Sequence, residues 1–182
     1  MSRYAVVLSS SLLLASVVAA TAQSPSPYAG QEQRPIKAVS ETEMGDLAQG
    51  RGMGLAKAAE LNSYPGPLHV LELADRLGLS AAQRAASEAL IAPMRDKAIA
   101  LGAQIIAAER DLDRAFAEGS VDATSLRRQV GKIAALQGEL RVTHLETHLA
   151  QRTILTPEQI ARYDSLRGYG SSATPNHNRH GN

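Results

Sequence analysis

The feature that most constrains the fold is a long stretch of helical periodicity between residues 80 and 153, interrupted at only two places. Apolar residues recur there at steps of three and four, the spacing that puts side chains on one face of an α-helix. Pro93 lacks a backbone donor and predicts a kink or split near that position. Gly119 ends the first helix, and the second is predicted to start near Asp122. Because few residues separate the two helices, they are predicted to form an antiparallel hairpin.

Each long helix carries one apolar stripe. The first stripe comprises Leu90, Met94, Ala98, Leu101, Ile105, Ala108, Leu112 and Phe116, and the second comprises Leu126, Val130, Ile133, Gln137, Leu140, His144 and His148. Only 3% of the residues are aromatic, which argues against an all-β fold. The sequence therefore predicts an all-α fold, an elongated antiparallel helical hairpin with short flanking helices. Such a hairpin encloses little volume, so we expect spare apolar surface and a homodimer.

Three short helices are expected around the hairpin. Ser40 and Glu43 form a capping box that starts a helix reaching to about residue 62, although three glycines between residues 50 and 54 weaken it. A short helix is expected over residues 68–77, ended by Gly78. The last helix is expected from Pro157 to about residue 167.

The first 22 residues have the pattern of an export signal. Arg3 precedes an apolar stretch, and the small residues up to Ala22 fit cleavage after that residue. A retained N-terminal anchor is the alternative, but the stretch is short for a membrane span. We expect a flexible leader over residues 23–40, a helical domain over 41–168, a disordered tail over 169–182, and no membrane insertion after cleavage. Removal of Arg3 leaves 18 basic and 18 acidic residues, since the whole chain has 19 and 18.

Two related pentapeptides stand at the ends of the predicted hairpin. Leu79-Ser80-Ala81-Ala82-Gln83 and Leu155-Thr156-Pro157-Glu158-Gln159 both follow a Leu-Ser/Thr-x-x-Gln pattern. In each copy the hydroxyl residue, Ser80 or Thr156, can cap the following helix, while Gln83 or Gln159 completes a capping box. These six positions (Leu79, Ser80, Gln83, Leu155, Thr156 and Gln159) are predicted to be structural.

Behind a signal peptide, the two copies resemble the LTxxQ superfamily of periplasmic proteins. That group includes Spy/CpxP-type chaperones and periplasmic heavy-metal-resistance and sensor proteins. The resemblance covers about residues 44–168. It implies a cradle-like helical dimer in the periplasm that acts in envelope stress or metal homeostasis. The Arg51-Gly52-Met53-Gly54 run favours the metal-resistance branch.

His144 and His148 are the sharpest candidates for metal ligands. A spacing of four places both imidazoles on one helical face, close enough to share a metal. Further ligands are expected from His69 and Glu72, with weaker candidates in Glu60, Met44 and Met53. Such a set suits Zn²⁺, Ni²⁺, Co²⁺ or Cu²⁺. The alternative is that both histidines are half-buried, hydrogen-bonded members of the core stripe. His177 and His180 in the tail are an exposed pair, more often incidental.

Several classes of function find no support in the sequence. The chain has no cysteine, which excludes thiolate catalysis and zinc–thiolate sites. The glycine-rich run has no strand pattern before it and no Gly-Lys-Ser/Thr after it, so no nucleotide is expected. The net charge of +1 argues against nucleic-acid binding. The acidic residues near 109–118 alternate with arginines, as on a solvated face, and we expect no enzyme.

Three functions remain open from the sequence. The first is a metal-responsive envelope-stress or heavy-metal-resistance protein that binds a divalent metal, unfolded clients or both. The second is an ATP-independent periplasmic chaperone with no metal role. The third is a helical adaptor that docks onto an envelope sensor kinase.

Overall fold

The computed structural model describes residues 26–169, all of whose regular elements are helical. The predicted signal peptide and most of the predicted tail, with His177 and His180, lie outside the described residues. The chain divides into two compact units, residues 1–32 and 33–182. The described residues of the first unit form turns and the first two residues of the short 3-10 helix η1 (Gln31–Gln33). None of the helices within 26–169 combines the length and the apolar character that a membrane crossing requires.

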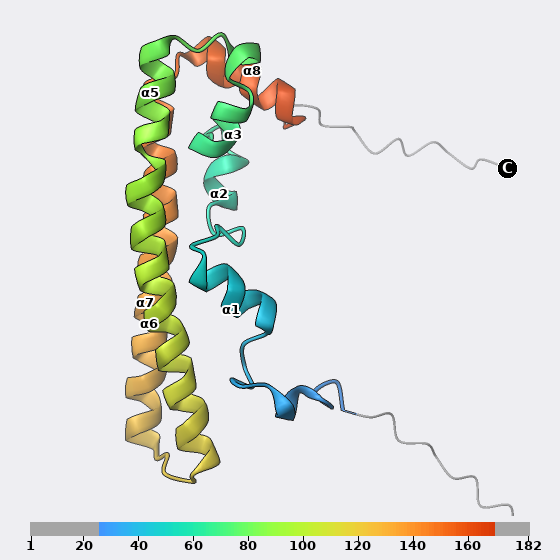
Figure 1. The fold of residues 1–182 in the computed structure, drawn as a ribbon, viewed down its shortest axis with the longest axis vertical. Helices are drawn as coiled ribbons and strands as arrows, with labels where there is room; N and C mark the ends of the chain where they lie inside the picture. The colour runs from blue at the N-terminus through green and yellow to red at the C-terminus, as the bar shows by residue number, and fades with distance from the viewer. Residues whose placement is uncertain (1–25, 170–182) are drawn as a thin grey trace, which may run out of the picture. The chain divides into compact units, whose positions relative to one another are not determined.

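The second unit is built on the predicted hairpin (Figure 1). Helices α5 (Ala81–Ala89) and α6 (Ile91–Ala117) form the first arm, and α7 (Ala123–Ile154) forms the second. The break at Leu90 lies three residues before Pro93, which has no N–H to offer the Ala89 carbonyl. Gly119 adopts a left-handed conformation after α6, with φ of 63°. Asp122 caps α7 by accepting hydrogen bonds from the backbone of Thr124 and Ser125. The sequence-based prediction of an all-helical hairpin is confirmed.

The last flanking helix, α8 (Pro157–Arg167), has the bounds that the sequence predicts, but the two flanking segments before the hairpin form shorter helices than expected. The expected helix over residues 41–62 is wrong in its second half: α1 (Glu41–Ala48) is followed by a loop and then by α2 (Lys57–Glu60). The reason is backbone conformation, since Gly50 and Gly54 have φ of 63° and 75°. These left-handed values suit glycine and cannot continue a right-handed helix. The expected helix over 68–77 is two pieces, α3 (Pro67–Glu72) and α4 (Ala74–Leu77), before the left-handed Gly78.

The core of the second unit has two parts. One joins α1 to the hairpin through Leu47, Ala98, Ile105 and Leu140. The other joins α3, α4 and α8 (Pro157–Arg167), and its buried members are Val70, Leu77, Leu155 and Tyr163. The flanking helices thus pack along one side of the hairpin (Figure 1), with α1 against α6, α2 and α3 against α7, and α4 against α8.

The segment before α1 also packs against the hairpin. Ile36 is fully buried and Val39 is 7% exposed. The backbone N–H and the ammonium group of Lys37 both donate to Asp113 of α6, at 3.2 and 3.1 Å. The Pro- and Gly-rich composition of the expected leader gave no sign of this packing of residues 36–39.

Candidate functional site

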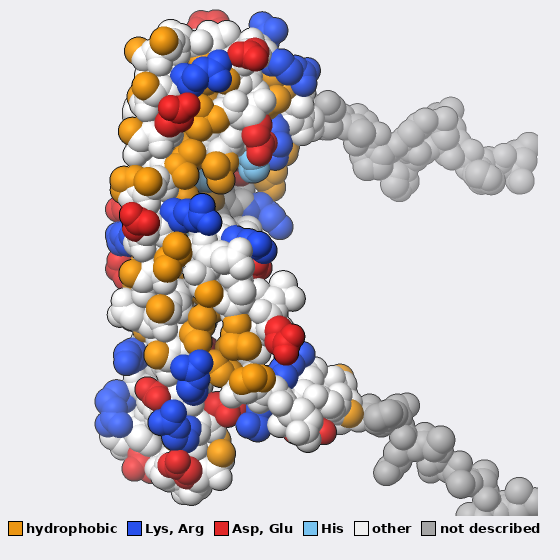
Figure 2. Space-filling view, in the orientation of Figure 1, with side chains coloured by type: hydrophobic (Ala, Val, Ile, Leu, Met, Phe, Trp, Pro, Cys, Tyr) orange, Lys and Arg blue, Asp and Glu red, His pale blue; other side chains and the backbone are white. Residues whose placement is uncertain are grey.

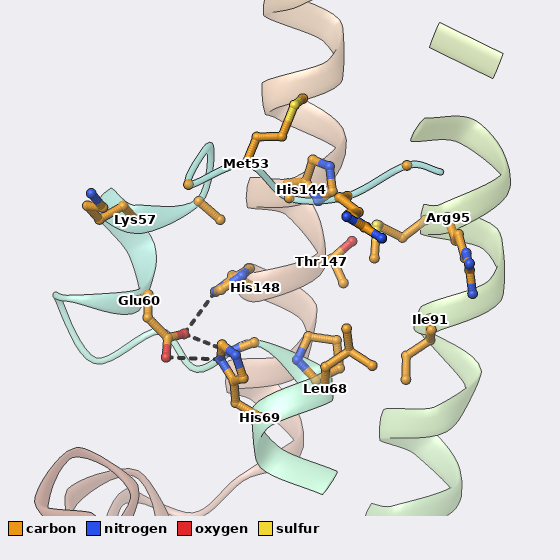
Figure 3. Close-up of a pocket in the computed structure, with 18 of the residues that line it drawn as sticks. Met53, Lys57, Glu60, Leu68, His69, Ile91, Arg95, His144, Thr147 and His148 are labelled. Atoms are coloured by element: carbon orange, nitrogen blue, oxygen red, sulfur yellow. Dashed lines mark hydrogen bonds and ion pairs between the residues drawn. The ribbon is translucent and has the colours of Figure 1, made fainter. Parts of the chain in front are cut away.

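A cavity of about 570 Å³ lies between the flanking helices and the hairpin. Its wall comes from the loop after α1, from α2 and α3, and from facing positions on α6 and α7 (Figure 3). Large apolar side chains line it, namely Met53, Leu61, Leu68, Ile91 and Met94. Three of these are also partly open to solvent: Met53 is 40% exposed, Leu61 55% and Leu68 54%. The cavity is therefore an apolar, accessible recess of the size that ligand sites have in proteins.

Three basic side chains line the same cavity. Arg51 is held by Asp46 at 3.0 Å and by the Gln49 amide oxygen at 2.8 Å. Lys57 and Arg95 form no ion pair within residues 26–169, and Figure 3 places them on opposite sides of the cavity. Figure 2 shows Lys and Arg side chains interspersed with apolar ones on this face of the molecule. The rim is consequently cationic around an apolar interior.

His144 lies on α7 at the cavity wall and is only 5% exposed. Its Nε2 atom is buried and has no hydrogen-bond partner among the described residues. Burial lowers the pKa of the imidazole below its ordinary value, and the nearby His148 lowers it further. His144 is therefore neutral at pH 7, and its buried Nε2 carries the cost of an unmade hydrogen bond.

His148 lies one turn further along α7 and is fixed by the loop before α3. Its Nδ1 is 2.7 Å from the carbonyl oxygen of Tyr64, which can only accept, so Nδ1 carries the proton. The other edge of the ring rests on Gly66, where an added Cβ would lie 2.9 Å from Cε1 and 3.0 Å from Nε2. Gly66 is thus required for this close packing of α3 on α7.

Glu60, which the sequence marked only as a weaker candidate, is the centre of the polar cluster. Its carboxylate accepts hydrogen bonds from the hydroxyls of Tyr163 and Tyr169 and from the backbone N–H of Gly66. His69 and His148 face it through their Nδ1 atoms, at 3.3 and 3.8 Å (Figure 3). Desolvation and the contact with Glu60 strongly raise the pKa of Tyr163. The carboxylate therefore ties α2, α3, α7 and α8 together.

The candidate metal ligands are only partly brought together. His69, His144 and His148 line the cavity, as does Met53. Glu72 is exposed on α3 and does not line it, nor does Met44 on α1. Over the described part of the chain, no three His, Asp or Glu side chains are grouped closely enough to hold a metal ion. The imidazoles of His69 and His148 lie beside the carboxylate of Glu60, and His144 lines the same cavity from α7.

The two pentapeptides meet at the end of the hairpin. Ser80 and Thr156 each accept from the backbone N–H three residues on, and Gln83 and Gln159 reach back to complete both capping boxes. The two glutamine amides also bond to each other, with N–O distances of 2.8 and 3.1 Å. Gln83 donates further to the carbonyl oxygen of Ile154, at 2.9 Å. We call this arrangement the glutamine clasp; the sequence predicts the caps but not the pairing.

The fold and the site define a class of protein: a helical hairpin closed at one end by two paired capping boxes, with short helices that enclose an apolar cavity on one side. The chain belongs to the LTXXQ motif family, whose family model, described as LTXXQ motif family protein, matches residues 68–167. This family includes Spy/CpxP-like proteins and is typically periplasmic. The match confirms the family that the two pentapeptides suggested. No curated protein and no solved structure matches the chain.

Proposed function

We propose that this protein is a periplasmic envelope-stress protein that binds apolar segments of unfolded clients at the cavity, without ATP and without catalysis. The observation that carries the proposal is the accessible apolar lining. Leu61 and Leu68 are more than half exposed at the wall of a cavity of about 570 Å³. Exposed apolar clusters of this kind are typical of surfaces that bind other apolar groups. Two or three apolar side chains of an extended segment fit such a volume.

The test is suppression of aggregation of a chemically denatured enzyme, measured by light scattering at near-stoichiometric ratio. Leu68→Asp places a charge at the cavity wall, and we expect it to reduce the suppression several-fold. Val130→Asp is the control, because Val130 is also well exposed, at 47%, but lines neither the cavity nor the dimer stripe proposed below. Lack of suppression by the unaltered protein, or equal loss in both variants, would refute client binding at this site.

A metal-responsive role is the second candidate, favoured by the buried Nε2 of His144, unpartnered within the described residues, and by His148 and His69 in the lining of the same cavity. Neutral imidazoles are good ligands for Zn²⁺, Ni²⁺, Co²⁺ and Cu²⁺. Binding would require side chains to move, since His148 Nδ1 is held by Tyr64 and its other edge by Gly66. Calorimetric titration with each metal, on the protein and on the double variant His144→Ala/His148→Ala, decides the matter. Equal affinities for both proteins would end this candidate.

We also propose a homodimer formed through the apolar side chains that the hairpin leaves uncovered. Val142 and Leu149 are seven residues apart on α7, hence on one face, and are 41% and 54% exposed. Two copies would bury such a stripe at an isologous interface. Sedimentation velocity at micromolar concentration is expected to give a dimer, and a compact monomer would contradict the proposal.

A further inference from the structure

We propose that the cavity is also a site for a single-chain amphipathic anion, a long-chain carboxylate whose tail fills the apolar interior and whose head group meets the cationic rim. The proposed binding of this anion is supported by the cavity itself. Its consequence, competition between this ligand and clients, rests on the proposed function. A free fatty acid has this chemistry.

The first step is the shape and chemistry of the interior. Met53, Leu61, Leu68, Ile91 and Met94 line a volume within the range of small-molecule sites. An unbranched hydrocarbon tail is apolar throughout and needs no hydrogen-bond partner in such a recess. Burial of each methylene contributes about 0.8 kcal/mol, which is about fourfold in affinity per carbon.

The second step is charge. Three basic side chains line the cavity against one carboxylate, that of Glu60. Glu60 is already occupied by the hydroxyls of Tyr163 and Tyr169 and by the N–H of Gly66. Arg51 is engaged by Asp46, which leaves Lys57 and Arg95 to receive an anionic head group. A cationic head group would find no free acceptor of opposite charge in the lining.

The third step is the unpartnered imidazole. His144 is 95% buried, given its 5% exposure, and lines the cavity, and its buried Nε2 bonds to no other group of residues 26–169. A neutral imidazole can carry its proton on Nε2 and donate to a carboxylate oxygen. An oxygen of the ligand would thus complete a hydrogen bond that the protein leaves unmade. The site has an apolar interior, a cationic rim and one buried polar atom, which is the composition of a carboxylate site.

The test uses three probes with the same tail: dodecanoate, dodecanol and dodecyltrimethylammonium, titrated below their micelle concentrations by calorimetry. We expect saturable binding of dodecanoate at one site per chain. Dodecanol is expected to bind about threefold to tenfold more weakly, and the cationic probe more weakly still. Decanoate, two carbons shorter, is expected to bind about 15-fold more weakly than dodecanoate.

Matched variants locate the site. Leu68→Trp narrows the cavity and is expected to abolish binding, while Val130→Trp, at a position that is 47% exposed and outside the cavity, is expected to leave binding unchanged. Arg95→Gln or Lys57→Gln is expected to weaken the binding of dodecanoate about threefold or more and to leave the binding of dodecanol unchanged. The variant that loses affinity identifies the side of the cavity that holds the head group. Arg110→Gln, also on α6 but outside the cavity, is the control.

Each contrary outcome would overturn one stated part of the proposal. Absence of saturable binding, or equal loss of dodecanoate affinity in the Leu68 and Val130 variants, would show that the cavity is not the binding site. Equal affinity for dodecanoate and dodecyltrimethylammonium would show that the site does not prefer anions. An unchanged dodecanoate affinity in both Arg95→Gln and Lys57→Gln would show the same. The aggregation assay without fatty acid is independent of these results. If dodecanoate binds but the protein does not suppress aggregation, the fatty-acid site stands and the proposed chaperone function is refuted. If the protein suppresses aggregation but does not bind dodecanoate, the chaperone function stands and the fatty-acid site is refuted.

Discussion

The packing of α1 on the hairpin makes a sharp prediction at Gly102. This residue is buried in the middle of α6, and the backbone of Leu47 in α1 lies directly over it. A Cβ added at Gly102 would lie 2.7 Å from the Leu47 carbonyl carbon and closer still to its oxygen. Ordinary contact begins at 3.4 Å, so α1 would have to move by at least about 0.7 Å. Backbone cannot rotate away from such a contact as a flexible side chain can.

The expected magnitude follows from two opposing effects of Gly102→Ala. Alanine in a helix interior stabilises by about 1 kcal/mol relative to glycine. Overpacking against backbone costs about 3 kcal/mol, near the upper end of the usual range. If α1 separates from α6 instead, the protein loses the burial of Leu47, which is only 8% exposed and contributes about 2 kcal/mol. We therefore expect the free energy of unfolding to fall by about 1–2 kcal/mol.

Urea denaturation followed by circular dichroism measures this change, with two matched controls on α7. Gly131 and Gly138 are also helical glycines, but an added Cβ at either position meets nothing within 4 Å. Gly131→Ala and Gly138→Ala are therefore expected to raise the free energy of unfolding by about 0.5–1 kcal/mol. The same substitution thus changes sign between the two arms of the hairpin. Stabilisation by Gly102→Ala would refute the close contact between α1 and α6.

Three further predictions concern His144, the two glutamines of the clasp, and Glu60. Because the pKa of His144 is lower in the folded protein, the unfolded chain binds more protons below about pH 6.5. The free energy of unfolding is thus expected to fall as the pH drops from 6.5, and His144→Phe to flatten this slope, as measured by urea denaturation between pH 5 and 8. Gln83→Ala and Gln159→Ala are each expected to cost about 1–2 kcal/mol. Their double variant is expected to cost at least about 0.5 kcal/mol less than the sum, and strict additivity would argue against the glutamine clasp. Glu60→Ala removes the acceptor of the buried Tyr163 hydroxyl and is expected to cost about 2–3 kcal/mol in the same assay, more than Tyr163→Phe, which leaves Glu60 its other donors.

The features that the sequence predicts well are those set by a few neighbouring residues. The capping box at Ser40 and Glu43 forms as expected, with the pKa of Glu43 lowered chiefly by the hydrogen bond from the Ser40 backbone. The break before Pro93 and the left-handed Gly119 also follow from local stereochemistry. A hairpin of two amphipathic helices needs little more information than these boundaries and the apolar stripes.

The features that the sequence could not give depend on contacts between distant segments. Glu60 and Tyr163 are 103 residues apart, and nothing local marks Glu60 as the centre of a buried cluster. Glu72 was preferred because it lies three residues from His69, but α3 turns it to solvent. The three glycines after α1 were expected only to weaken a continuous helix, but the helix ends before them. Met53 in the same loop has φ of 43°, which lies outside the right-handed helical region.

The glutamine clasp is connected with the cavity through α8 and Glu60. As caps, Gln83 and Gln159 stabilise only the first turns of α5 and α8. As a pair, they fix where α8 begins relative to α5, because their amides hydrogen-bond to each other between the first turns of the two helices. Tyr163 lies on α8 and donates to Glu60, so the position of α8 determines that of Glu60 and hence of α2 at the cavity wall. The motif therefore acts on the site through the helices that it positions. A loosened clasp is expected to weaken ligand binding at the cavity although neither glutamine lines it.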